Sequence, residues 1–308
     1  MTVIVPGRDI AAFASEAIAS LRAQSEPRWR AILIDDGSTD ATGALFAEAA
    51  AADPRFTVIA HEAARGLGAA RNAGLELVDT PYLGFLDGDD TLTPWALERM
   101  LGTLSETGSD FLVGAYVRSR PADGGYAPGR VQPWVAAATS PARRATTIIA
   151  HPAASGNIVA WSKLSRTGFW QGRRFPENVA YEDQIVAQKM YVQARSFDVI
   201  PDVVVHWRLR EDGTSITQGK GRLPVLRDYL AALRGGIEVL RAAGAADAVA
   251  HRIGLILSMD VPPLEEIAAQ HPDPAYARTL ATFLAELRAL PEAAFASVDP
   301  ALRTALAW

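Results

Sequence analysis

Short apolar runs alternate with segments of helical periodicity along the first part of the chain. The apolar runs cover residues 2–5, 31–34, 56–60, 82–86 and 110–117. Helical spacing of apolar residues falls between them, over 10–24, 41–52, 68–77 and 94–104. Strands that alternate with helices in this way form a mainly parallel sheet with right-handed crossovers. The sequence therefore predicts an α/β fold with a Rossmann-like sheet and flanking helices.

Carboxylates directly follow two of these apolar runs. Asp35 and Asp36 end the second run, and Asp87, Asp89 and Asp90 follow the fourth. Ligands of parallel sheets bind outside the carboxyl ends of the strands, so both acidic groups are expected at one edge, around one ligand. Carboxylates this close repel one another unless a cation offsets their charge, and Mg²⁺ and Mn²⁺ take oxygen ligands and bridge to phosphates. This edge is therefore a candidate site for a divalent cation.

Three other interpretations of these loops compete with a cation site. The acidic run is also consistent with a solvated turn, in which Thr93 and Pro94 start the next helix. It further resembles the first motif of haloacid dehalogenase-type phosphatases, whose first Asp, here Asp87, is the nucleophile. That family begins its core fold with this motif, which would leave the preceding strands and helices without a role. Residues 66–71 start like a dinucleotide-binding glycine loop, but Arg71 stands where the third glycine should be.

The second half of the chain has a different texture. Residues 119–146 are rich in Pro, Gly, Ala and Arg, which is typical of a lid or a disordered insertion. Residues 197–207 read as a further strand. From Leu223 onward the pattern is helical and contains no strand-like run. We therefore place a boundary there, with an α/β domain over 1–222 and a C-terminal helical region over 223–308.

Composition excludes several classes of function. The formal net charge is −5 and no basic stripe supplies phosphate contacts, which argues against nucleic acid as a partner. The chain has no cysteine, so it has neither a disulfide framework nor thiolate chemistry. No run reaches the roughly 18 apolar residues of a membrane span. We expect a soluble cytoplasmic protein, with peripheral contact to the inner face of the membrane as an open alternative.

Five motifs in this order give the chain a family resemblance. They lie at residues 3–6, 34–40, 70–75, 85–90 and 181–183. In combination they resemble the family 2 glycosyltransferases of the GT-A fold, in particular the bacterial enzymes that build cell-surface polysaccharides and teichoic acids. The resemblance covers about residues 1 to 217. It departs from the family at Gly7-Arg8-Asp9, where a Tyr-Asn pair is usual, and at Trp161, which stands in place of an Asn.

The resemblance implies roles for individual residues. Pro6 and Asp36 would line the nucleoside pocket, and Arg71 would help to hold the nucleotide. Asp87 and Asp89 would form the Asp-x-Asp pair, with Asp89 on the metal. Asp183 would be the general base, although it could instead cap the helix that begins near it. Glu182 points in another direction from Asp183 in either backbone conformation, so we expect that the two are not interchangeable.

The late part of the resemblance concerns residues near the end of the last strand. His206 stands where some family members place a further ligand of the metal or the diphosphate, and its alternative is a structural histidine. Arg208, Arg210 and Ser215 resemble the segment that closes over the diphosphate in related enzymes. The alternative for these three residues is a solvated basic loop.

The function implied by the resemblance is an inverting, metal-dependent sugar transfer. The donor would be a nucleoside diphosphate sugar, with a UDP-sugar favoured, and the cofactor would be Mn²⁺ or Mg²⁺. The acceptor would be a hydroxyl group of a glycan, a lipid-linked glycan or a polymer at the cell surface. The C-terminal region would bind the acceptor or form a homo-oligomer. The alternatives are the phosphatase that uses Asp87 and a protein that binds a nucleotide sugar without catalysis.

Overall fold

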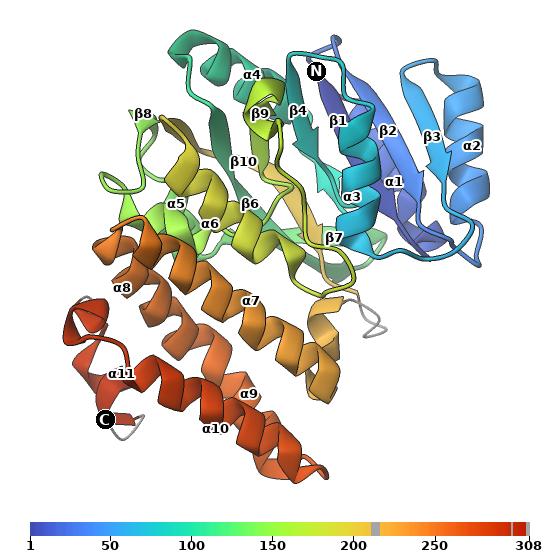
Figure 1. Ribbon diagram of the computed structural model, residues 1–308. Coiled ribbons are helices and arrows are strands. Elements are labelled where there is room, and N and C mark those ends of the chain that lie inside the picture. Colours follow the sequence, from blue (N-terminus) through green and yellow to red (C-terminus); the bar gives the residue numbers. More distant parts are fainter. Residues whose placement is uncertain (211–215, 297, 306–308) are drawn as a thin grey trace.

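The computed structural model describes residues 1–210, 216–296 and 298–305 (Figure 1). Its central sheet has the strand order β3-β2-β1-β4-β9-β6-β10-β5, with β7 beside β6 and β8 beside β10. The strands are β1 Thr2–Gly7, β2 Arg30–Asp35, β3 Phe56–Ala60, β4 Tyr82–Phe85, β5 Thr91–Leu92, β6 Phe111–Ala122, β7 Gly125–Val131, β8 Arg143–Thr146, β9 Lys163–Arg166 and β10 Phe197–Arg208.

The predicted α/β sheet is confirmed, and its parallel part carries the acidic loops. The neighbours β3, β2, β1 and β4 are all parallel, as are β6 and β10. The short strand β9 lies antiparallel between β4 and β6. Gly7 pairs with Asp35 at the end of β1 and β2, and the amide of Gly88 donates to the carbonyl of Pro6 at 3.0 Å. The loops after β1, β2 and β4 therefore meet at one edge, as the sequence predicted.

Six helices precede the C-terminal region. They are α1 Ala11–Arg22, α2 Thr42–Ala52, α3 Leu67–Glu76, α4 Ala96–Thr107, α5 Pro133–Thr139 and α6 Glu182–Gln193. Helix α3 packs closely on β1. Glycine at position 74 permits this approach, since an added Cβ would lie 2.5 Å from the Ile4 side chain. Helix α4 begins at Ala96, and the hydroxyl of Thr93 donates to the Val203 carbonyl instead of capping it. The interpretation of Thr93 and Pro94 as the start of that helix is therefore wrong.

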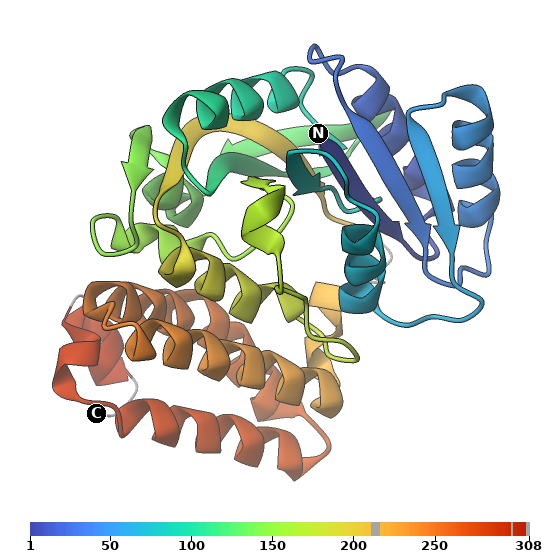
Figure 2. The ribbon, with the colours of Figure 1, turned by 45° about the horizontal axis from the view of Figure 1, so that its top comes forward.

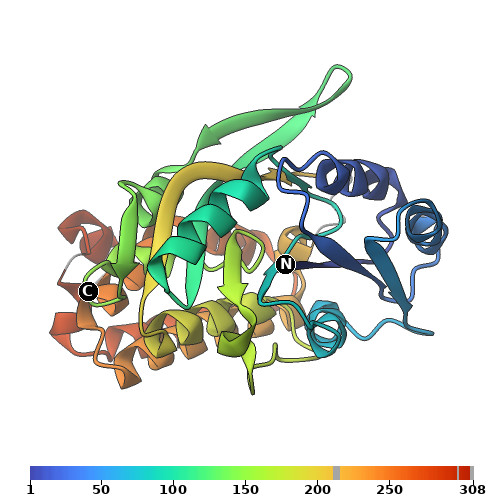
Figure 3. The same ribbon diagram turned by 90° about the horizontal axis from the view of Figure 1, so that it is seen from above.

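Residues 119–146 form regular structure, which corrects the expectation of a lid or a disordered insertion. Strand β6 runs on to Ala122 and returns as β7, and α5 and β8 follow. Gly124 and Gly125 have φ values of 81° and 146°, a backbone conformation that favours glycine and permits the reversal. Val135 of α5 is fully buried. In Figure 3 the β6–β7 hairpin projects from the body of the molecule.

The C-terminal region is helical, as predicted, and its described residues contain no strand. It comprises α7 Leu223–Ala242, α8 Ala246–Leu255, a π-helical turn Ile256–Asp260, α9 Val261–Gln270, α10 Pro274–Arg288 and α11 Pro300–Ala305. Figures 1 and 2 show α7 beside α6, with this region on the side of the molecule away from β1 to β3. One set of buried apolar side chains continues from the sheet into these helices. No helix in the described part of the chain is both long enough and apolar enough to cross a membrane.

Candidate active site

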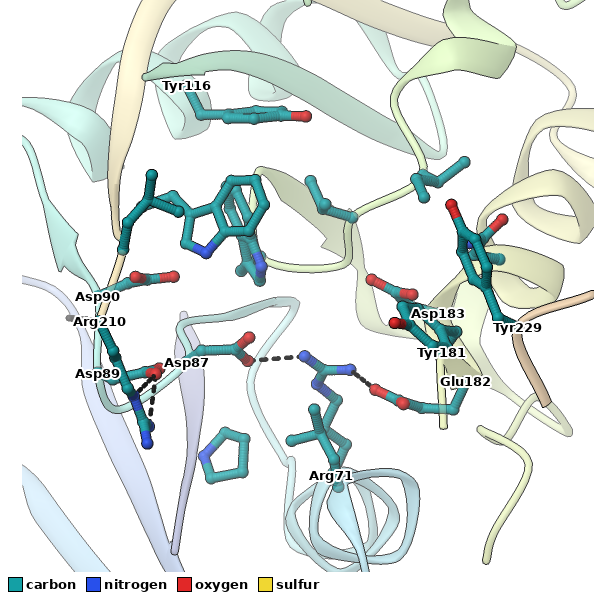
Figure 4. A pocket seen from close by; sticks show the side chains of 18 of the residues that line it. Arg71, Asp87, Asp89, Asp90, Tyr116, Tyr181, Glu182, Asp183, Arg210 and Tyr229 are labelled. Atoms are coloured by element: carbon teal, nitrogen blue, oxygen red, sulfur yellow. Dashed lines mark hydrogen bonds and ion pairs between the residues drawn. The ribbon is translucent and has the colours of Figure 1, made fainter. Parts of the chain in front are cut away.

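A cavity of about 890 Å³ opens where β1, β2 and β4 end. Its walls come from the loops after these strands, from α3 and α6, and from the C-terminal helices. The predicted site residues that line it are Pro6, Asp36, Arg71, Asp87, Asp89, Asp183 and Arg210. Figure 4 shows the Asp87–Asp90 loop on one side of Arg71 and Asp183 on the other. The structure therefore brings the two halves of the predicted site into one space.

Three carboxylates gather at the end of β4. One ligand oxygen each of Asp87, Asp89 and Asp90 lies within 4.8 Å of the other two. Burial raises the pKa of Asp87, and burial together with the charges of Asp89 and Asp87 raises the pKa of Asp90 well above its usual value. A bound divalent cation would relieve this repulsion, and carboxylate oxygens are ligands that Mg²⁺ and Mn²⁺ prefer. The donor set therefore fits the predicted cofactor.

Arg210 and Arg208 hold this acidic loop in different ways. The guanidinium of Arg210 lines the cavity and donates to Asp89 Oδ2, with Nη2 at 2.6 Å and Nε at 2.9 Å. Arg208 instead turns away from the cavity and is 1% exposed. Its amide donates to Asp90 Oδ1 at 2.8 Å and its guanidinium to Glu16 Oε2 at 2.8 Å. Arg208 thus stabilises the acidic loop on the side away from the cavity, and it does not line the cavity itself. Ser215 lies outside the described residues.

His206 is the second predicted site residue that does not line the cavity. It lies on β10 opposite Thr91 of β5 and is half-buried. Burial lowers the pKa of its imidazole. Its ring is not among the side chains that gather with Asp89 in the described part of the chain. The pairing of β10 with β5 and β6 fixes the direction of its side chain, and the sequence alone could not give that pairing.

Asp36 anchors the loop that leads into α3. Its carboxylate accepts hydrogen bonds from the backbone amides of Arg65 at 2.9 Å and Gly66 at 2.8 Å, and pairs with His61 Nδ1 at 2.7 Å. Gly66 has a φ of 89°, a conformation that favours glycine. Asp36 is 4% exposed and still lines the cavity. Its position directly after β2 suits the predicted nucleoside pocket. Its hydrogen bonds also fix the loop that forms part of the cavity wall.

Arg71 connects the two sides of the cavity through buried ion pairs. Its Nη2 donates to Asp87 Oδ1 at 2.6 Å and its Nη1 to Glu182 Oε1. The Arg71 guanidinium also lies over the Phe175 ring, 5.2 Å from its centroid. Arg71, which was predicted to help hold the nucleotide, thus forms ion pairs with two carboxylates of the protein itself. Glu182 was not among the predicted site residues, and only its place beside Asp183 could have indicated it.

Asp183 lines the cavity from the first turn of α6. The helix begins at Glu182 and its N-cap position is Tyr181, so the alternative in which Asp183 caps the helix is wrong. Burial, followed by the neighbouring charge of Glu182, raises the pKa of Asp183 to about 7. Both adjacent acids line the cavity, but they differ as expected in their partners, because Glu182 pairs with Arg71 and Asp183 does not. A carboxyl group with this pKa can accept a proton near neutral pH.

Aromatic side chains form a wall that the sequence did not reveal. Tyr116 and Trp161 meet at 4.7 Å between ring centroids, and Trp207 lies 6.0 Å from Trp161. Tyr181 and Tyr229 pack at 4.4 Å beside Asp183 (Figure 4). These rings come from β6, β10, α7 and the loops before β9 and α6. Aromatic rings in a cavity wall are surfaces on which sugar rings can stack, but the convergence of these rings depends on tertiary packing.

Comparison with known proteins places this geometry in a known group. The family model described as Glycosyl transferase family 2 matches residues 2–165. The putative teichuronic acid biosynthesis glycosyltransferase TuaG of Bacillus subtilis (strain 168) is 32% identical over 116 residues, which are 38% of this chain and 46% of TuaG. The chain spans about half or less of the length of the curated relatives it matches.

Solved structures share the fold. S. aureus TarS 1-349 in complex with UDP-GlcNAc has a TM-score of 0.77 at 21% identity, covering 99% of this chain and 86% of that one. The mannosyltransferase PcManGT from Pyrobaculum calidifontis, in complex with GDP-Man and Mn²⁺, has a TM-score of 0.58 at 18% identity, covering 99% and 82%. At these identities the likeness establishes the architecture alone.

Proposed function

The chain belongs to glycosyl transferase family 2 and has the GT-A fold, and from this premise we propose that it transfers a sugar from a nucleoside diphosphate sugar to a hydroxyl group of a glycan acceptor. The reaction would invert the configuration at the anomeric carbon. One observation carries the proposal: a carboxylate cluster at the strand ends and the acid Asp183 face one cavity from its two sides. UDP is the favoured nucleotide, because solved relatives with this fold hold UDP or UDP-GlcNAc.

The donor side of the cavity binds the nucleotide sugar. Pro6 and Asp36 bound the nucleoside pocket at the ends of β1 and β2, and Arg210 reaches the loop where the diphosphate would lie. Asp89 would hold Mn²⁺ or Mg²⁺ together with Asp87 and Asp90. When bound, such an ion acts as a Lewis acid on the departing diphosphate. Because the site consists of carboxylates, binding requires that all three be deprotonated, which favours neutral and higher pH.

The acceptor side of the cavity contains the proton acceptor. Asp183 would take the proton of the attacking hydroxyl group as that group displaces the nucleotide in one step, which gives inversion. Its pKa near 7 leaves a substantial fraction deprotonated at neutral pH and gives the carboxylate more basicity than an exposed aspartate has. Arg71 and Glu182 hold Asp183 and Asp87 in fixed relative positions, so they position the site and do not contact the reacting atoms.

The two alternatives account for less of the molecule. In a phosphatase Asp87 would attack a phosphate, but here it follows the fourth strand of the chain and is paired with Arg71. A protein that only binds a nucleotide sugar would not need Asp183 in the cavity wall. The cell-surface acceptor, the cytoplasmic location, the contact with the inner membrane face and the self-association through the C-terminal helices all remain part of the proposal.

A thermal-shift panel tests the donor assignment. The full chain is heated with UDP-, GDP-, dTDP- and CDP-sugars, each with and without Mn²⁺. A ligand at 100 times its dissociation constant stabilises the folded state by about 2.7 kcal/mol, so the correct donor should raise the melting temperature clearly. Slow hydrolysis of that donor in the presence of Mn²⁺ would support transfer. Hydrolysis of an aryl phosphate without any response to sugar nucleotides would favour the phosphatase instead.

A further inference from the structure

The acceptor side of the cavity carries basic side chains that the proposed reaction does not use. Arg118 of β6, Lys220 and Arg252 of α8 all line the cavity. They come from distant parts of the sequence and converge only in the folded chain. No step in the proposed transfer needs a cation on this side, because Arg210 and the carboxylate cluster serve the diphosphate. These side chains therefore indicate a second binding site at this end of the cavity.

Arg118 contacts two aromatic rings and lacks a carboxylate partner among the described residues. Its guanidinium lies 4.9 Å from the Trp207 ring centroid and 5.2 Å from that of Trp134. Its Nε is buried and donates to no acceptor in the described part of the chain. Burial lowers the pKa of Arg118, because removing the charged guanidinium from water costs free energy. An anion from outside would satisfy both the charge and the donor.

Lys220 likewise lies against two aromatic rings of the cavity wall. Its ammonium group lies 3.9 Å from the ring centroid of Tyr229 and 5.9 Å from that of Tyr181. It has no ion pair with a carboxylate of the described residues, and burial lowers its pKa. The hydroxyl of Tyr181 is also buried without a partner in the same part of the structure. This end of the cavity thus offers an unpaired cation and an unpaired hydroxyl group within one small region.

Arg252 and Asp260 complete the surroundings. Arg252 Nη2 lies 3.0 Å from Gln184 Oε1 and 3.5 Å from Asp260 Oδ2, and the Tyr229 hydroxyl donates to Asp260 Oδ1 at 2.6 Å. Gln184 follows Asp183 in α6 and also lines the cavity, so these groups lie at the end of the cavity where α6 begins and not at the carboxylate cluster. Arg252 thus has Asp260 as a partner, whereas Arg118 and Lys220 have no carboxylate partner among the described residues of this end.

We propose that this end of the cavity binds an anionic group, a carboxylate or a phosphate, that belongs to the acceptor glycan. The inference rests on the proposed transferase function and narrows its acceptor to acidic glycans. Arg118 and Lys220 would pair with the anion, and the rings of Tyr181, Tyr229 and Trp207 would contact the sugar that carries it. The charge would orient the acceptor so that its hydroxyl group faces Asp183.

Binding of acidic oligomers to the full chain tests this proposal. The protein is saturated with UDP and Mn²⁺ to fill the donor side, and calorimetry follows the binding of oligogalacturonate, of a glycerol phosphate oligomer and of carboxyl-reduced oligogalacturonate. At least one acidic oligomer should bind roughly tenfold or more tightly than the neutral one, as hydrogen bonds to charged groups allow. The oligomer that shows the preference identifies the anion as a carboxylate or a phosphate.

Charge-removing variants locate the site. R118Q and K220Q should each weaken binding of the preferred acidic oligomer by roughly tenfold and leave the neutral oligomer unchanged. R120Q is the matched control, because Arg120 lies on the same strand, is exposed and does not line the cavity. The proposal is overturned if no acidic oligomer binds better than the neutral one, or if R118Q and K220Q both bind the acidic oligomer as tightly as the wild type. If R118Q does not fold, K220Q decides the question, because the Lys220 side chain lines the cavity and its replacement leaves the Arg118 contacts in place.

Failure of the two proposals gives different results. Hydrolysis of a UDP-sugar by the same preparations reports on the donor side alone. Hydrolysis without any preference for acidic oligomers would overturn the acidic-acceptor inference and leave the transferase function standing. Absence of both nucleotide-sugar binding and hydrolysis would overturn the proposed function itself.

Discussion

Asp89 is the residue on which metal-dependent donor binding depends most directly. Its carboxylate lies in the cavity with those of Asp87 and Asp90. In D89A we expect Mn²⁺-dependent binding of the sugar nucleotide to be lost, because the remaining two carboxylates provide too few ligands, while the melting temperature changes little. D123A, at the exposed turn of the β6–β7 hairpin, is the control. Calorimetry that finds the same nucleotide affinity with and without Mn²⁺ in the wild type would contradict the account.

The pKa of Asp183 makes a prediction about pH. A general base acts in its deprotonated form, so kcat/KM should rise with pH and reach half of its plateau near pH 7, the value to which burial raises the pKa of Asp183. An exposed aspartate would place this midpoint near pH 4. The pH profile of transfer at saturating Mn²⁺ measures it. A profile that is flat between pH 5 and 8 would assign the proton transfer to another group.

At the residue scale the sequence located the acids but not the direction of every side chain. Asp36 and Asp87 follow apolar runs, Asp183 lies in the first turn of α6, and each lines the cavity. Arg208 and His206 lie outside it because the pairing of β10 with its neighbours turns them away. Pairing between distant strands leaves no local pattern, so neither residue could be assigned from the sequence.

The contact between α3, the β4 loop and α6 depends on one buried ionic bridge. Arg71 is 1% exposed and pairs with Asp87 and Glu182. E182Q removes one of the two carboxylates that pair with Arg71, and a hydrogen bond to a charged group contributes about 1.5–3 kcal/mol, so we expect the free energy of unfolding to fall by about 2 kcal/mol. E106Q breaks an exposed pair with Arg144 and should cost less than about 1 kcal/mol. If urea denaturation finds the same loss of free energy of unfolding in both variants, the buried ion pair contributes no more to stability than the exposed one.

At the element scale, long segments were predictable and short ones were not. The strands of the parallel half and their helices follow apolar patterns that extend over four or more residues. Strand β5 has two residues, so it carries no period of its own. The 119–146 segment was misread because Pro, Gly and Arg are also compatible with an exposed hairpin, whose strand β7 is stabilised by pairing with β6. Composition alone does not separate the two cases.

The whole molecule shares one core, which predicts its unfolding behaviour. Buried apolar residues continue from the sheet through α6 into α7, where Leu233 is 1% exposed. We expect a single cooperative transition in urea, followed by fluorescence and circular dichroism. L233A should lower the free energy of unfolding by about 2–5 kcal/mol while the transition stays single. Two separate transitions would instead support the predicted division at residue 222.

The sequence predicted the C-terminal helices, with acceptor binding or self-association as their role, but not which of their side chains line the site. Tyr229, Arg252 and Asp260 lie after the predicted boundary and still form part of the cavity wall. Helical periodicity identifies which side chains are buried, but it does not identify what they are buried against. The proposed acceptor side therefore became visible only when the helices were packed on α6.

The central claim is that one cavity joins donor binding to a base at Asp183, and one variant tests it directly. D183N keeps the size of the side chain and removes the basic carboxylate. With saturating donor, acceptor and Mn²⁺, we expect transfer to fall by at least about a hundredfold, while the melting temperature and the donor affinity stay near those of the wild type. Transfer within a few-fold of the wild type would contradict the account and place the base elsewhere in the cavity.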